Sequence, residues 1–151
     1  GDGGLSMLLG ELLTVKLHNL PIKTVVFNNS SLGMVKLEMI VEGFPDFQTD
    51  HEQVNFTAIA EGVGIKSFRV EDPSDLKQAL VDALTHDGPA LVDIVTDPDA
   101  LSLPPDISWD MLKGFTTASV KTVLDGGVGR MVNLARRNIR QIGAATAIVK
   151  P

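Results

Sequence analysis

Two short polar motifs near the start of the chain have the residue types and spacing of a divalent-metal site. The first is Gly1-Asp2-Gly3-Gly4 and the second is Asn28-Asn29-Ser30-Ser31. Asp2 and Asn29 lie 27 positions apart, and the pattern between them is that of a helix followed by a strand. Such a connection brings a carboxylate and an amide oxygen together. Because Mg2+ takes oxygen ligands, often a single carboxylate with neutral oxygens and phosphates, we predict a cation site there.

The segments that must position these motifs alternate between helix and strand. Leucines at helical spacing predict a helix over residues 4–18, and the β-branched run at 22–27 predicts a strand buried on both faces. Further helices are predicted over 31–40, 56–63 and 76–86, strands over 67–70 and 90–95, and an ordered loop over 43–50. The alternation predicts an α/β fold, a parallel sheet with helices on both faces, whose core spans residues 1–97.

The C-terminal part has a different character. Pro98, Pro104 and Pro105 mark a boundary, so we expect one domain over 1–105 and a helical extension over 106–151. Within the extension, residues 128–142 predict a basic amphipathic helix. Its apolar positions are Val128, Met131, Val132, Ala135, Ile139 and Ile142, and its basic positions are Arg130, Arg136, Arg137 and Arg140.

Charge separates the two parts further. Residues 114–151 hold six Lys or Arg and one Asp, for a net charge of +5, whereas residues 1–113 carry −11. The basic helix therefore suits either an anionic lipid surface or an acidic patch of its own protein. Nucleic acid is not an expected partner, because the body is acidic and aromatic residues make up only 5% of the chain.

Other functional classes are disfavoured by composition. The chain has no Cys, which excludes disulfides and thiolate metal sites, and no apolar run approaches the roughly 20 residues of a membrane span. We expect a cytoplasmic protein, with peripheral contact at the inner face of the cell membrane through 128–142. Since ligand sites of this kind follow a strand, a strand is expected before Gly1, and the chain is interpreted as a fragment that is inactive alone.

The paired motifs resemble the thiamine diphosphate (ThDP) fingerprint, a GDG followed some two dozen residues later by NN. The resemblance implies that Asp2, the Asn29 side chain and the Ser31 backbone carbonyl bind Mg2+. It places Gly1, Gly3 and Gly4 beside the diphosphate, which could approach a backbone without side chains. Two further cofactor-binding residues, Leu32 and Met34, would line the pocket over the thiazolium ring.

Across nearly its whole length the chain is similar to the bacterial pyruvate oxidases, or quinone-dependent pyruvate dehydrogenases. The similarity rests on residues 1–7, 26–30, 32–35 and 88–93, and on the tail from Gly114. It implies oxidative decarboxylation of pyruvate to acetate and CO2, with electrons passing through FAD, bound by another domain, to quinone. It also implies a homo-oligomer, a dimer of dimers, and a C-terminal segment linked to lipid activation.

Val35 and Glu38 bear on the reaction. Decarboxylases of the pyruvate type carry an acidic proton donor six residues after the metal-binding Asn, where this chain has Val35. The decarboxylated intermediate would then be open to oxidation or to a second keto acid. Glu38 matches a Glu near the reaction centre of related oxidases, which makes it a candidate catalytic residue, although its position also suits a solvent-facing helix residue.

Two alternatives remain open. Acetolactate synthases share Gly33-Met34-Val35 but typically continue with a basic residue and an aromatic, whereas this chain has Lys36 and then Leu37-Glu38-Met39. The chain could also be a non-catalytic ThDP-fold module that binds a partner.

Overall fold

The computed structural model describes residues 1–100 and 109–148, with side chains described as far as Asn138. By packing, the chain forms two compact units. Unit 1 consists of Gly1–Ser31 and Glu52–Thr96, and unit 2 consists of Leu32–His51 and the described residues from Asp97 onward. The predicted boundary after residue 105 lies outside the described residues and stays a prediction.

Unit 1 contains a three-stranded parallel sheet in the order β1-β3-β2. Its strands are β1 (Lys23–Asn28), β2 (Lys66–Val70) and β3 (Ala90–Val95). The central strand β3 is buried along nearly its whole length, which explains its unbroken apolar run, interrupted only by Asp93. In the β1–β3 register Val26 lies opposite Asp93, so the one buried carboxylate of β3 faces the same side as Val26.

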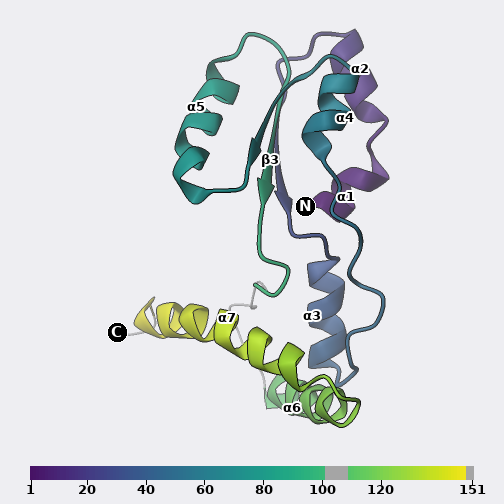
Figure 1. Ribbon diagram of the computed structural model, residues 1–151, viewed down its shortest axis with the longest axis vertical. Coiled ribbons are helices and arrows are strands. Elements are labelled where there is room, and N and C mark those ends of the chain that lie inside the picture. The colour runs from purple at the N-terminus through teal and green to yellow at the C-terminus, as the bar shows by residue number, and fades with distance from the viewer. Residues whose placement is uncertain (101–108, 149–151) are drawn as a thin grey trace. The chain divides into compact units, whose positions relative to one another are not determined.

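Helices cover both faces of this sheet, as predicted (Figure 1). On one face α2 (Glu11–Leu17) and α4 (Phe56–Gly62) pack through Leu12, Phe56 and Ala60 onto Val26 and Leu91. On the other face α5 (Leu76–Thr85) packs onto Val70, Val92 and Ile94. A 3-10 turn, η1 (Pro73–Asp75), leads into α5 after Asp72, whose side chain accepts a hydrogen bond from the Ser74 N–H.

The first predicted helix is in fact two. In place of one helix over 4–18, the chain forms α1 (Asp2–Met7), a short turn, and α2. Gly10 caps the start of α2, and glycine costs about 1 kcal/mol relative to alanine inside a helix. The leucine spacing correctly predicts helix, but it runs through a break at the glycine that periodicity alone does not reveal.

Unit 2 is helical and contains α3 (Gly33–Val41), α6 (Trp109–Leu124) and α7 (Val128–Ile148). Helix α6 lies within the predicted helical extension, although no separate helix is predicted over its residues. It crosses α3 at Gly114, where a Cβ atom would lie only 1.6 Å from the Val41 carbonyl oxygen. The backbones therefore meet without a side chain between them, and the glycine that permits this crossing also weakens the helical pattern in the sequence.

The buried face of α7 is not the predicted apolar stripe. The buried side chains of the helix are Leu134 and Asn138, with Met131 partly buried, whereas Val128 and Val132 are about half exposed. The buried face lies beside that stripe, because α7 turns Leu134 toward Leu37, Ile40 and Ala118. Ile139, Arg140 and Ile142 lie outside the residues with described side chains. Among the described helices, none combines the length and apolarity that crossing a bilayer requires.

Candidate functional site

The second polar motif forms a tight loop at the carboxyl end of β1. Ser30 adopts a left-handed backbone conformation with φ of 54°, which is unusual for a residue other than glycine. The Ser31 N–H donates to Oδ1 of Asn29 at 3.2 Å. The loop thus turns sharply just beyond the sheet edge, the position at which open α/β sheets bind ligands. Backbone strain of this kind is common at ligand sites.

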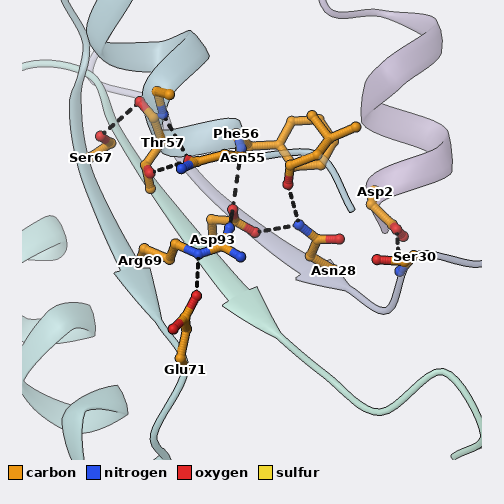
Figure 2. Close-up of polar contacts among 12 residues, drawn as sticks. Asp2, Asn28, Ser30, Asn55, Phe56, Thr57, Ser67, Arg69, Glu71 and Asp93 are labelled. Atoms are coloured by element: carbon orange, nitrogen blue, oxygen red, sulfur yellow. Dashed lines mark hydrogen bonds and ion pairs between the residues drawn. The ribbon is translucent and has the colours of Figure 1, made fainter. Parts of the chain in front are cut away.

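Asp2 is fixed to this loop although it comes from the first motif. Its carboxylate Oδ2 accepts the Ser30 N–H at 2.7 Å, and only 2% of the residue is exposed (Figure 2). The predicted meeting of the two motifs is therefore present in the structure. It brings a carboxylate next to a loop that contains the Asn29 amide oxygen and the buried backbone of Ser31.

The chemistry of this oxygen set fits Mg2+. One carboxylate, one amide oxygen and one backbone carbonyl are hard neutral or anionic oxygens, which Mg2+ accepts alongside phosphates and water. Among residues 1–100 and 109–148, no group of three or more His, Cys, Asp or Glu side chains is placed to hold a metal. A cation at this oxygen set would take its remaining ligands from water or from a bound molecule.

The first turn of α1 lies beside these oxygens. Gly3 and Gly4 belong to this turn, where backbone N–H groups have no acceptor within the helix. A Cβ atom at Gly4 would meet no atom of the described chain within 4 Å, so the surface there is open. This space suits a ligand that contacts backbone, as the resemblance requires of a diphosphate.

A buried polar network lies beneath the loop. Asn28 and Asp93 are both fully buried, and the Asn28 amide Nδ2 donates to Oδ1 of Asp93 at 3.0 Å and to the Val54 carbonyl at 2.8 Å. The other oxygen of Asp93 accepts the Phe56 N–H at the start of α4 and Nη1 of Arg69 at 2.7 Å (Figure 2). Asp93 therefore joins all three strands and one helix.

Arg69 closes this network at the surface. It also pairs with Glu71, and the hydrogen bond to Glu71 is the main reason that the pKa of Arg69 lies above its ordinary value. The charge of Asp93 acts in the same direction, and partial burial opposes both. Arg69 is therefore a permanent cation facing a fully buried carboxylate.

The family is shown by comparison with known proteins. Residues 1–94 match the model of the thiamine pyrophosphate enzyme, C-terminal TPP binding domain, where thiamine pyrophosphate is another name for ThDP. The chain belongs to the thiamine pyrophosphate enzymes. The matched residues include both polar motifs and the Asn28–Asp93 network.

Individual relatives in this family differ in name. YdaP of Bacillus subtilis, provisionally named a thiamine pyrophosphate-containing protein, is 34% identical over 136 residues, covering 90% of this chain and 24% of YdaP. A Methanococcus aeolicus protein, provisionally named an acetolactate synthase large subunit, is 37% identical over 117 residues. The match covers 70% of this chain and 18% of the M. aeolicus protein. A 3D-(3,5/4)-trihydroxycyclohexane-1,2-dione hydrolase of Bacillus velezensis is 33% identical, and the match covers 72% of this chain and 18% of the hydrolase. The chain spans a quarter or less of the length of these relatives.

The predicted site residues of this thiamine pyrophosphate enzyme are divided between the two units. Asp2, Asn29 and Ser31 belong to unit 1, whereas Leu32, Met34 and Glu38 belong to unit 2. In unit 2, Met34 is 63% exposed, and Leu32 and Glu38 are exposed as well. The pocket-lining role of Leu32 and Met34 and the catalytic role of Glu38 stay predictions.

Asn28 and Asp93 are the residues that sequence reasoning missed. The sequence pattern identifies Asn28 only as part of the motif and Asp93 only as part of a buried strand. One signal was available, because an acidic residue inside an otherwise apolar strand must have partners to be buried. The identity of those partners depends on contacts between residues 65 positions apart.

Proposed function

We propose that Asp2, Asn29 and the Ser31 carbonyl hold Mg2+ and, through it, the diphosphate of ThDP. The observation that carries this proposal is the buried Asp2 carboxylate fixed at 2.7 Å to the N–H of Ser30 in the second motif. That contact orients a negative charge beside two neutral oxygens at the edge of the sheet. The open first turn of α1 adds backbone donors on the same unit.

When bound, ThDP supplies the electron sink for cleavage of the bond next to a keto group. The residues of this chain have a different task, which is to bind and orient. Asp2 neutralises part of the cation charge, Asn29 and Ser31 complete the protein ligands, and Gly3 and Gly4 leave the helix backbone accessible. The left-handed Ser30 sets the turn that lets these groups face one ligand.

For the intact protein we propose oxidative decarboxylation of pyruvate to acetate and CO2, with FAD and then quinone as electron acceptors and with a homo-oligomeric assembly. The resemblance of the motifs to the pyruvate oxidases supports this proposal. So does the departure of Leu37-Glu38-Met39 from the aromatic residue that acetolactate synthases typically carry after the basic position. Val35 on α3 cannot donate a proton, so the intermediate is left for oxidation or for a second keto acid.

Acetolactate synthesis is the second candidate. It is favoured by relatives named as acetolactate synthases at 34–37% identity, and by the shared Gly33-Met34-Val35. Both reactions begin with decarboxylation of pyruvate. They differ in whether the next step needs an oxidant or a second pyruvate.

The stoichiometry of the intact protein separates the two reactions. With pyruvate, ThDP and Mg2+, the oxidase reaction consumes water and releases one acetate, one CO2 and two electrons per pyruvate, so turnover depends on an added acceptor such as ferricyanide. Acetolactate synthesis releases one CO2 per two pyruvates and needs no acceptor. Acetolactate formed without an acceptor would overturn the oxidase proposal. If ThDP binds but pyruvate is not consumed, both reactions are excluded and a binding module is favoured.

A further inference from the structure

The side-chain oxygen of Asn28 has an unusual environment. Asn28 is 0% exposed, and its Oδ1 has no hydrogen-bond partner among the residues that the structure describes. A buried carbonyl oxygen without a donor is costly, so it is rare in folded proteins unless a ligand or water supplies the donor. In Figure 2 this end of the amide points toward the side on which Asp2 and Ser30 lie.

The orientation of the amide follows from its other contacts. Nδ2 of Asn28 faces the Val54 carbonyl and Oδ1 of Asp93, and both of these groups accept hydrogen bonds. The NH2 group must therefore lie on their side, and the oxygen must lie on the other. Asp93 is itself held by the Phe56 N–H and by Arg69, so it cannot turn away without leaving those donors.

We propose that Asp93 is a positioning residue for the cation site, and that it acts by holding the Asn28 amide with its oxygen toward that site. Asn28 Oδ1 would then accept a hydrogen bond from a water in the hydration shell of the bound Mg2+, which usually keeps several waters. Asn28 is thus an outer ligand, distinct from the three protein oxygens of the proposed site. This inference rests on the proposed function.

Asp93→Asn in the intact protein tests the role. An amide at position 93 can donate to Asn28 Oδ1, which permits the Asn28 amide to turn and present NH2 to the cation shell. We expect the affinity for Mn2+, used as a spectroscopic substitute for Mg2+ in the presence of ThDP, to fall about tenfold by electron paramagnetic resonance. The matched control is Arg69→Met, which removes another partner of Asp93 and leaves the amide orientation unchanged.

The Arg69→Met control distinguishes a changed orientation of the Asn28 amide from a general loss of protein stability. Both variants should lower the melting temperature, but Arg69→Met should keep the Mn2+ affinity within about twofold of wild type. Equal affinity losses in the two variants, or none in Asp93→Asn, would overturn the role of Asp93. Asp2→Asn is measured in parallel, and if it leaves Mn2+ binding unchanged, the cation site itself is refuted rather than the role of Asp93.

A second measurement uses only the wild-type protein, so it does not require any variant to fold. In a crystal structure of the intact wild-type protein with Mg2+ and ThDP, we expect a water or cofactor donor within about 3.2 Å of Asn28 Oδ1. A structure with the cation bound and no donor at that oxygen would contradict the assignment.

Discussion

At the scale of single residues, the Asp2 carboxylate has a structural contact and a charge, and the two can be separated. The contact is the hydrogen bond from the Ser30 N–H, which needs only an oxygen acceptor. The negative charge is what a cation requires in addition. A side chain of the same shape without the charge therefore distinguishes folding from metal binding.

Asp2→Asn is the variant that makes this separation. Its amide oxygen can still accept the Ser30 N–H, so we expect the free energy of unfolding to change by less than about 1 kcal/mol. Mg2+-dependent ThDP binding should be lost, because the amide offers no negative charge to the ion. Isothermal titration of the intact protein with ThDP, with and without Mg2+, measures this effect. Unchanged affinity would show that Asp2 is not a cation ligand.

Asp2 and Asn29 could be proposed as ligands from the sequence, because motif residues and their spacing are local properties, and their ligand roles stay predictions. The sequence predicts that the two motifs meet, but it does not indicate that the Ser30 N–H makes the contact with Asp2. Asn28 and Asp93 could not be predicted, because each is satisfied by residues on other strands and helices. Burial of a charged side chain becomes visible only after the strands are placed beside one another.

At the scale of elements, Gly114 controls how closely α6 can approach α3. A Cβ atom there would overlap the Val41 carbonyl oxygen, so Gly114→Ala must move the two helices apart. We expect a loss of about 1–3 kcal/mol in the free energy of unfolding. Urea denaturation followed by circular dichroism measures it.

Gly129 provides the matched control for this prediction. It also lies in a helix of unit 2, but a Cβ atom there would meet nothing within 4 Å. Gly129→Ala should therefore leave stability unchanged or raise it by up to about 1 kcal/mol, since alanine is the better helix former. If the two substitutions had the same effect, the close crossing of α3 and α6 would be wrong.

The elements of unit 1 were largely predictable because their patterns repeat at helix and strand periods. The three strands were predicted to within a few residues, and helices α4 and α5 to within one. The failures occur where glycine interrupts a pattern, at the break between α1 and α2 and at the centre of α6. In α7 the period was recognised, but the buried face depends on Leu37, Ile40 and Ala118, which belong to other helices.

At the scale of the whole molecule, the acidic and basic parts of the chain meet within unit 2. Arg130 of α7 pairs with Asp46 and Asp50, which also pair with the buried Lys36. Arg137 pairs with Asp97, whose other oxygen accepts the Asp99 N–H. Two of the basic residues predicted to contact lipid therefore have carboxylate partners in their own unit. The expected contact with anionic lipid must compete with these pairs.

Asp97→Asn measures this competition. The amide can still accept the Asp99 N–H but no longer neutralises Arg137. One basic residue freed near an anionic membrane contributes about 1 kcal/mol to the free energy of membrane binding. We therefore expect about fivefold stronger binding of the intact variant to phosphatidylserine-containing vesicles in a flotation assay at low salt, and no change with neutral phosphatidylcholine vesicles. Adding Arg137→Gln should remove the gain, and 0.5 M salt should suppress it, because exposed charges are screened over a few ångströms at that concentration. Equal binding of wild type and Asp97→Asn to anionic vesicles, or equal binding to both kinds of vesicle, would leave α7 as a helix that docks on its own protein.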